Sequence, residues 1–206
     1  RHCAELSPER LRELIPLVWQ EFSCRVAGDV DRFGAHPEGA RGWWNDYLQR
    51  ICDLAGLPHP GPFAAAELYD RFARADAWEI YDDVPPTLDQ LEAAGFRLAL
   101  TSNWDPRLPE LLGRLGLLDR FETLVYSAEV GYEKPHRAIF DRLLEELGLA
   151  AHEVVHVGDR ALDDVEGAEA AGILALRIDR RGGGRLSDLR QLPPRLAPAG
   201  PIGMLD

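Results

Sequence analysis

The chain has few cysteines and no long apolar run, and both shortages exclude classes of protein. Its cysteines, Cys3, Cys24 and Cys52, are odd in number, scattered and without metal-ligand spacing. Reduced thiols in a cytoplasmic protein are therefore expected, and no cysteine lies beside a histidine motif of the kind that activates a thiol. No stretch approaches the roughly 20 apolar residues that cross a bilayer, and the first residues do not form a basic-then-apolar signal segment.

Methionine is nearly absent as well. The chain begins at Arg1, and its single methionine is Met204. Because a primary translation product normally begins with methionine, we expect the natural protein to have further residues upstream of Arg1.

Positive charge is also in short supply, with a formal net charge of −12 over 206 residues. Such a chain repels polyanions and has no basic stripe, which argues against nucleic acid or an anionic membrane as its partner. A small phosphorylated substrate remains compatible, since a local site can be positive within an acidic surface. The sequence leaves open whether the protein is a monomer or a homodimer.

Residues 1–83 are predicted to form an all-helical domain. Ser7 followed by Pro8 is typical of a helix start, and apolar residues then recur at helical spacing as far as Phe22. Pro16 lies inside this run and predicts a kink or a break. Further helices are expected at 40–54 and 62–74, with a loop at 28–39.

The pattern of apolar residues changes after Pro85-Pro86. Strands are predicted at 96–101, 123–126, 154–157 and 173–178, and they alternate with helices at 87–94, 108–115, 138–147 and 163–171. This alternation predicts an α/β core at 84–180, with a mostly parallel, Rossmann-like sheet covered by helices on both faces. Residues 181–206 are expected to form a C-terminal helix at 186–196 and a loose tail.

Chemically capable side chains follow three of the predicted strands. They are Ser102 and Asn103 after one strand, Lys134 after the next strand and loop, and Asp159, Asp163 and Asp164 after a third. In an open parallel sheet, ligands bind beyond the carboxyl ends of the strands. A hydroxyl and an ammonium group suit phosphoryl oxygens, and carboxylates on a tight Gly-Asp turn suit Mg²⁺. The strand ends therefore predict a site for a phosphate and a divalent cation.

These strand ends resemble three motifs of the haloacid dehalogenase superfamily. Residues 98–105 (LALTSNWD) resemble its second motif, residues 131–135 (GYEKP) its third and residues 155–168 (VHVGDRALDDVEGA) its fourth. The resemblance covers about Tyr81 to Ile178, and the helices before it resemble the cap of one subclass. The most specific resemblance is to the group of haloacid dehalogenase-like hydrolase domain-containing protein 3, through Ser-Asn near Asp-x-Arg-Leu.

The resemblance implies a role for each site residue. We assign Ser102, Asn103 and Lys134 to catalysis. Ser102 and Lys134 would hold the transferred phosphoryl group, and Asp159 would bind Mg²⁺ directly or through water. Asp163 or Asp164 would orient the lysine or the metal-bound waters, and the sequence leaves open which of them does so; we assign Asp164 to catalysis and Asp163 to the metal. The alternatives are a plain turn at residues 102–103, a solvated surface lysine, and an aspartate that only begins a helix.

The cap contains a group of aromatic and polar residues that could face the substrate: Arg41, Trp43, Trp44, Asn45 and Tyr47. Aromatic residues at helical spacing more often belong to a hydrophobic core, so the sequence leaves both readings open.

The first motif of the family, Asp-x-Asp at the end of a central strand, is absent. Its first aspartate attacks phosphorus, and its second acts as general acid and base. The only Asp-x-Asp is Asp29-Val30-Asp31, which we expect to be loop acids. By the resemblance, the missing strand would lie between the strands that end at Ser102 and Gly158, leaving their backbone groups unpaired.

Three functions remain open at this stage. The first is a Mg²⁺-dependent phosphatase whose nucleophile lies upstream of Arg1. The second is a catalytically inactive binding or scaffold protein with the same fold. The third is a 2-haloacid dehalogenase, although that branch tends to have Ser-Ser-Asn where this chain has Val157-Gly158-Asp159.

Overall fold

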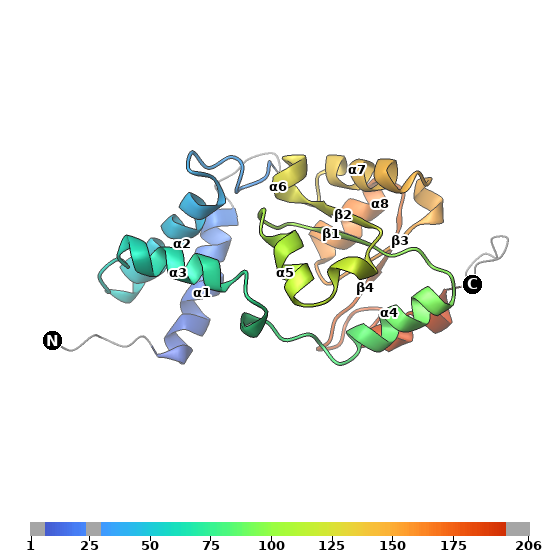
Figure 1. Cartoon of the computed structure of the whole chain (residues 1–206), viewed down its shortest axis with the longest axis horizontal. Coiled ribbons are helices and arrows are strands. Elements are labelled where there is room, and N and C mark those ends of the chain that lie inside the picture. The colour runs from blue at the N-terminus through green and yellow to red at the C-terminus, as the bar shows by residue number, and fades with distance from the viewer. Residues whose placement is uncertain (1–6, 24–29, 197–206) are drawn as a thin grey trace.

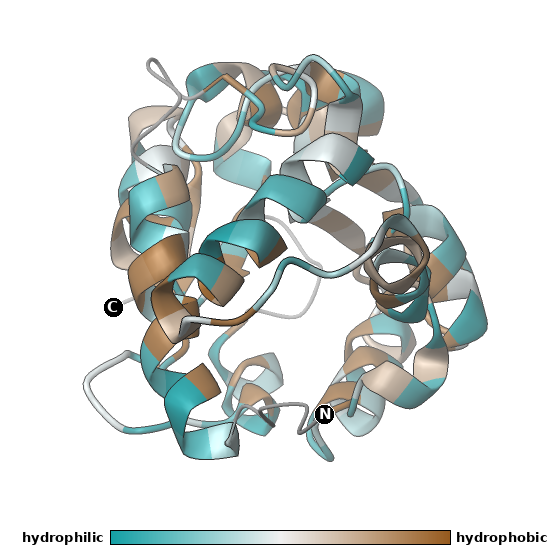
Figure 2. Cartoon of the chain, turned by 90° about the vertical axis from the view of Figure 1, so that its left-hand side faces the viewer, coloured by the Kyte–Doolittle hydropathy of each residue, from teal (hydrophilic) through white to brown (hydrophobic). Residues whose placement is uncertain are grey.

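A computed structural model describes residues 7–23 and 30–196, and it shows a helical cap beside an α/β core (Figure 1). The cap consists of α1 (Pro8–Ser23), α2 (Gly39–Ala55) and α3 (Pro62–Arg71). Each of these helices has one apolar face, and the helices in Figure 2 are accordingly banded in brown and teal. None of the described helices is both long and apolar enough to cross a membrane.

A kink or a break was predicted at Pro16, and the break does not occur. The helix continues from Pro8 to Ser23 with Pro16 inside. Pro16 is exposed, whereas Leu14, Val18 and Phe22 are buried in the cap. The backbone carbonyl that proline deprives of a hydrogen bond therefore lies on the solvent side, and packing of the opposite face holds the helix together.

The cap is built around aromatic rings. Trp43 stacks on Tyr47 with 5.4 Å between ring centroids, and Phe22 meets Trp43 edge to face at the same distance. Trp43 and Tyr47 are each only 4% exposed. These two members of the aromatic and polar group are therefore core residues and do not face a substrate.

The core elements follow the predicted alternation, with shifts of a few residues at their ends. Its strands are β1 (Ala99–Ser102), β2 (Thr123–Tyr126), β3 (Val155–Gly158) and β4 (Leu174–Arg177). Its α-helices are α4 (Val84–Ala93), α5 (Leu108–Arg114), α6 (Ser127–Val130), α7 (Arg137–Leu147) and α8 (Gly167–Ala170). The helix predicted at 163–171 begins instead as a π-helical turn, Ala161–Glu166.

The strands form two parallel pairs. Ser102 of β1 lies opposite Tyr126 of β2, and Gly158 of β3 lies opposite Arg177 of β4. Within the described residues, no hydrogen-bonded ladder joins β1 to β3. Both pairs nevertheless contribute to one hydrophobic core, in which α7 contacts residues of β2 and β4. The two pairs thus stay together through side-chain packing, as expected for a sheet whose central strand is not among these residues.

The prediction of a C-terminal helix at residues 186–196 is wrong. Only the short 3₁₀ turns Leu189–Gln191 and Pro193–Arg195 form there, because consecutive prolines cannot donate helical hydrogen bonds. Leu186 and Leu192 still pack against Leu91 of α4. The tail predicted to be loose, residues 197–206, lies outside the described residues.

Candidate functional site

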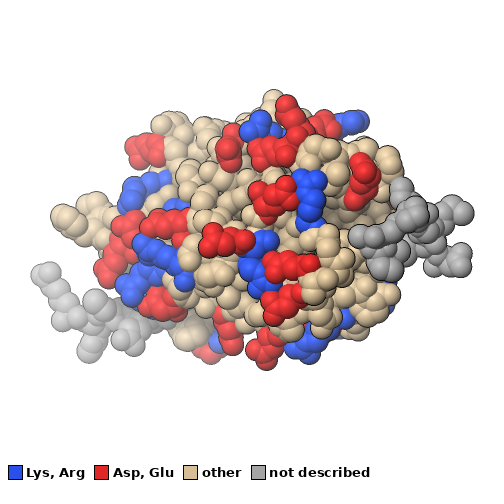
Figure 3. All heavy atoms as spheres, turned by 45° about the vertical axis from the view of Figure 1, so that its right-hand side comes forward, with Lys and Arg blue, Asp and Glu red and all other residues tan. Residues whose placement is uncertain are grey.

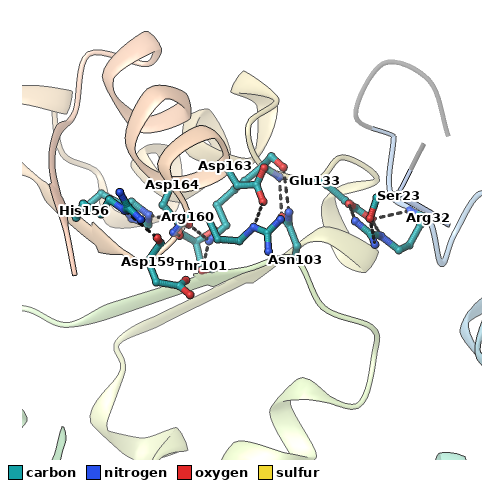
Figure 4. Close-up of polar contacts among 12 residues, drawn as sticks. Ser23, Arg32, Thr101, Asn103, Glu133, His156, Asp159, Arg160, Asp163 and Asp164 are labelled. Carbon is teal, nitrogen blue, oxygen red and sulfur yellow. Dashed lines mark hydrogen bonds and ion pairs between the residues drawn. The ribbon is translucent and has the colours of Figure 1, made fainter. Parts of the chain in front are cut away.

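Lys134 lies between the ends of β1 and β3. Its Nζ donates to the carbonyl oxygen of Thr101 at 3.0 Å and forms an ion pair with Asp164 Oδ1 at 2.7 Å. Only 10% of its side chain is exposed, so Lys134 is not a solvated surface lysine. The structure thus brings the end of β1, the loop before α7 and the turn after β3 to one rim (Figure 4).

Lys134 is also the only lysine of the chain, since 22 of the 23 basic residues are arginine. An ammonium group is compact and has three donors, whereas the guanidinium group is a broad planar fork. Among the described residues, the Lys134 ammonium has two partners, Thr101 O and Asp164 Oδ1, for its three donors. This bias in composition is a signal that motif reading missed.

Asn103 holds the Lys134 loop through its backbone. Its Oδ1 accepts from Lys134 N at 2.6 Å, and its Nδ2 donates to Lys134 O at 2.9 Å. Residues 102–103 are therefore more than a plain turn. With both polar atoms of the side chain occupied, Asn103 is a positioning residue in this structure, whereas the sequence placed it among the catalytic residues.

Asp164, and not Asp163, is the partner of the lysine. Asp164 is 4% exposed; its Oδ1 also contacts His156 Nε2 at 3.4 Å, and its Oδ2 accepts from the backbone N of Arg160 at 3.0 Å. Burial alone would raise the pKa of Asp164, but the hydrogen bond from His156 and the charge of Lys134 lower it well below its ordinary value. Asp164 therefore stays ionised beside the lysine.

Asp159 and Asp163 are the residues predicted for the metal. Asp159 is exposed, and its carboxylate makes no ion pair with a described residue; Figure 4 shows it close to the labelled Thr101 and His156. Asp163 Oδ2 instead pairs with Arg160 Nε at 2.5 Å, so a role at a metal would require breaking that contact. Ser102 ends β1 at the same rim, half-buried.

The described residues at the rim provide one carboxylate that could bind Mg²⁺. Mg²⁺ keeps several waters and is commonly bound by one or two carboxylates together with substrate phosphate. Asp159 offers one unpaired carboxylate of this kind. Across the described part of the chain, no three His, Cys, Asp or Glu side chains gather into a complete cage. A metal at this rim would therefore need ligands besides the described side chains, such as water or a substrate phosphate.

A cap residue contacts the loop that follows β1. Trp44 Nε1 donates to Asp105 Oδ2 at 2.8 Å, and Asp105 also accepts from Arg107 Nε at 2.9 Å. The Arg107 guanidinium lies over the ring of Tyr69 in α3, 3.6 Å from its centroid. Trp44, one of the cap residues that the sequence suggested could face the site, thus contacts the loop that begins directly after Ser102.

Charge on the molecular surface is mixed. On the face shown in Figure 3, the described acidic and basic side chains are interspersed and form no continuous basic stripe. This face gives no support to a nucleic-acid interface.

Comparisons with known proteins all indicate the same family. Residues 7–172 match the profile of the haloacid dehalogenase-like hydrolases. Haloacid dehalogenase-like hydrolase domain-containing protein 3 of Danio rerio is 32% identical over 93% of this chain and 83% of that protein. Glyceraldehyde 3-phosphate phosphatase of Methanopyrus kandleri is 41% identical over 61% of this chain and 54% of that protein.

Solved structures show the same fold with two chemistries. A HAD phosphatase from Thermococcus onnurineus matches with a TM-score of 0.59 and 26% identity, covering 89% of each chain. A 2-haloacid dehalogenase from Pseudomonas syringae matches with a TM-score of 0.58 and 26% identity, covering 93% of this chain and 81% of that one. The chain spans little more than half the length of several curated relatives, including 56% of the human domain-containing protein 3.

Proposed function

Given that this chain belongs to the haloacid dehalogenase-like hydrolase family, we propose that it forms the cap and most of the core of a Mg²⁺-dependent phosphatase. Its substrate would be a small phosphorylated metabolite. The observation that carries the proposal is the chain's only lysine, held between Thr101 O and Asp164 at the strand rim, with the unpaired carboxylate of Asp159 at the same rim. The phosphatase named among its relatives supports the same chemistry.

Each residue at the rim has a distinct task in this proposal. Lys134 neutralises a phosphoryl oxygen through its third donor, and the Ser102 hydroxyl donates to another. Asp164 keeps the lysine charged and aimed at the rim, and Asn103 fixes the loop that carries it. Asp159 would hold Mg²⁺, which when bound supplies further positive charge against the phosphate.

The nucleophile must come from outside the described residues. Of the only Asp-x-Asp, Asp29 lies outside the described part, and Asp31 lies in a loop, as predicted, but is fully buried. We propose that a strand between β1 and β3 presents an aspartate at the rim. Its carboxylate would attack phosphorus and expel the alcohol, which takes up a proton, and water would then hydrolyse the aspartyl-phosphate.

A second candidate is a binding protein of the same fold. It is favoured by one observation: of the acids described at the rim, Asp164 is paired with Lys134 and Asp163 with Arg160, and Asp159 is the one assigned to the metal. A third, the dehalogenase, shares the fold and has a solved relative of similar identity. The carboxylate of Asp159 favours phosphate chemistry over it, because a cation bound there would offset the negative charge of a phosphoryl group.

One experiment separates these candidates. The complete natural reading frame is expressed and assayed with p-nitrophenyl phosphate and with a 2-haloacid, each with Mg²⁺ and with EDTA. Release of p-nitrophenol that EDTA abolishes is the expected result. Halide release without metal would favour the dehalogenase, and inertness toward both substrates would favour the binding protein.

A further inference from the structure

A buried ion pair joins the cap to the loop that carries Lys134. Arg32 donates from Nε to Glu133 Oε1 at 2.6 Å, and its Nη2 lies 2.5 Å from Glu133 Oε2. The backbone N of Arg32 also donates to Glu133 Oε1, at 2.9 Å. The two side chains are 12% and 9% exposed, so this pair differs from the many ion pairs at the surface.

The other side of Arg32 faces the aromatic core of the cap. Its guanidinium lies 4.9 Å from the ring centroid of Trp19 and 5.7 Å from that of Trp43. Its Nη1 donates to Ser23 Oγ, at the end of α1, at 3.3 Å. Arg32 thus lies between the cap core and Glu133 (Figure 4).

Backbone contacts strengthen the same junction. Asp31 N donates to Gly131 O at 2.9 Å, and Val30 forms an antiparallel bridge with Tyr132. Segment 30–32 of the cap is therefore tied to segment 131–133 by main-chain and side-chain contacts. The next residue in the loop is Lys134, whose own backbone is held by Asn103.

We infer that Arg32 and Glu133 are positioning residues for Lys134, so that the place of the cap sets where the ammonium group lies. Glu133 and Lys134 are adjacent in the chain, so Arg32 on the cap side and Asn103 on the core side hold neighbouring residues of one loop. The consequence for phosphate binding rests on the proposed function. The coupling of the cap to the lysine rests on these contacts alone.

The single lysine makes the inference directly measurable. Lys134 is the only lysine of these 206 residues, so this chain, labelled with ¹³C at lysine Cε, gives one signal. Its chemical shift is recorded for the wild type, Arg32→Met and Glu133→Gln, and binding of inorganic phosphate is measured by calorimetry. The matched control is Arg97→Met, which removes an exposed pair of the same type, Arg97 Nε to Glu122 Oε2 at 2.6 Å.

The expected result is a displaced Lys134 signal in both junction variants and an unmoved one in Arg97→Met. Loss of the partners that orient the ligands of a metal commonly costs 10–100-fold in affinity; with a comparable role for the partners of Lys134, the Kd for phosphate should rise about tenfold. Near-ultraviolet circular dichroism of the cap tryptophans shows whether each variant is folded. Should Arg32→Met fail to fold, Glu133→Gln, which keeps the shape of the side chain, decides by the same signal.

An unmoved Lys134 signal in a folded junction variant would overturn the inference. If the wild type binds no phosphate while the signal moves in the variants, the proposed ligand class fails and the coupling of the cap to the lysine stands. If the Lys134 signal moves in the junction variants but their affinity for phosphate is unchanged, the cap is coupled to the position of the lysine, and its role in phosphate binding is overturned.

Discussion

Replacing Gly158 with alanine should force Asp164 away from Lys134. Gly158 ends β3, and a Cβ at this position would lie 2.2 Å from Asp164 Cγ and 2.4 Å from Asp164 Cβ. Rotation about the side-chain bonds does not move Asp164 Cβ, because that atom is fixed to the backbone. The turn Ala161–Glu166 must therefore shift as a whole, and the 2.7 Å contact with Lys134 is lost.

The cost follows from two effects. Overpacking of a well-filled interior costs about 1–3 kcal/mol. Loss of hydrogen bonds between buried charged groups costs roughly 1.5–3 kcal/mol. Since partial relaxation makes these overlap, the free energy of unfolding should fall by about 2–5 kcal/mol, against a typical total of roughly 5–15 kcal/mol. At about 2–4 °C for each kcal/mol, Tm should fall by roughly 5–20 °C.

Urea and thermal unfolding of Gly158→Ala beside Gly113→Ala provide the measurement. In the control, the nearest atom to the added methyl group is Leu118 Cδ2 at 3.9 Å, and Gly113 lies within α5. Alanine should therefore stabilise that helix by about 0.5–1 kcal/mol. A Gly158→Ala protein as stable as the wild type, with the Lys134 signal unmoved, would show that Asp164 does not occupy the assigned place.

Three further predictions concern carboxylates. Asp83 accepts from Arg180 at 2.6 and 2.9 Å and from Leu189 N at 2.8 Å, so Asp83→Asn should lower the free energy of unfolding by about 1.5–3 kcal/mol at pH 7. Because Arg180 lowers the pKa of Asp83, this difference should be complete above about pH 4 and fade as the pH falls further, which a urea series in acid checks. Burial raises the pKa of Asp31, whose Oδ1 has no hydrogen-bond partner among the described residues. Ionisation of Asp31 therefore destabilises the fold as the pH rises. Asp31→Asn should raise the free energy of unfolding by about 1 kcal/mol at pH 7 and by progressively less toward pH 4. An equal increase at both pH values would contradict the raised pKa of Asp31. Asp159→Asn in the complete protein should abolish Mg²⁺-dependent turnover and leave Tm nearly unchanged because the side chain is exposed, whereas full activity would place the metal elsewhere.

Local pattern determined most of the secondary structure. Apolar residues at helical spacing predicted the three cap helices, and the strand predicted at 123–126 is Thr123–Tyr126 in the structure. These features depend on neighbours within a few positions, which a single sequence displays. The failures occurred where local chemistry competed with the pattern, as at the prolines after Leu192 and at the turn Ala161–Glu166.

The sequence alone also located the rim, because residues after parallel strands share one edge of a sheet. Only the tertiary structure decided what each side chain does there. Asp163 and Asp164 are adjacent in the chain and chemically identical, and the geometry of the turn directs Asp164 inward to Lys134 and Asp163 outward to Arg160. Arg32 and Glu133 are 101 positions apart, and no local pattern records that they meet. Such pairings depend on distances in space between distant segments, which only the folded chain establishes.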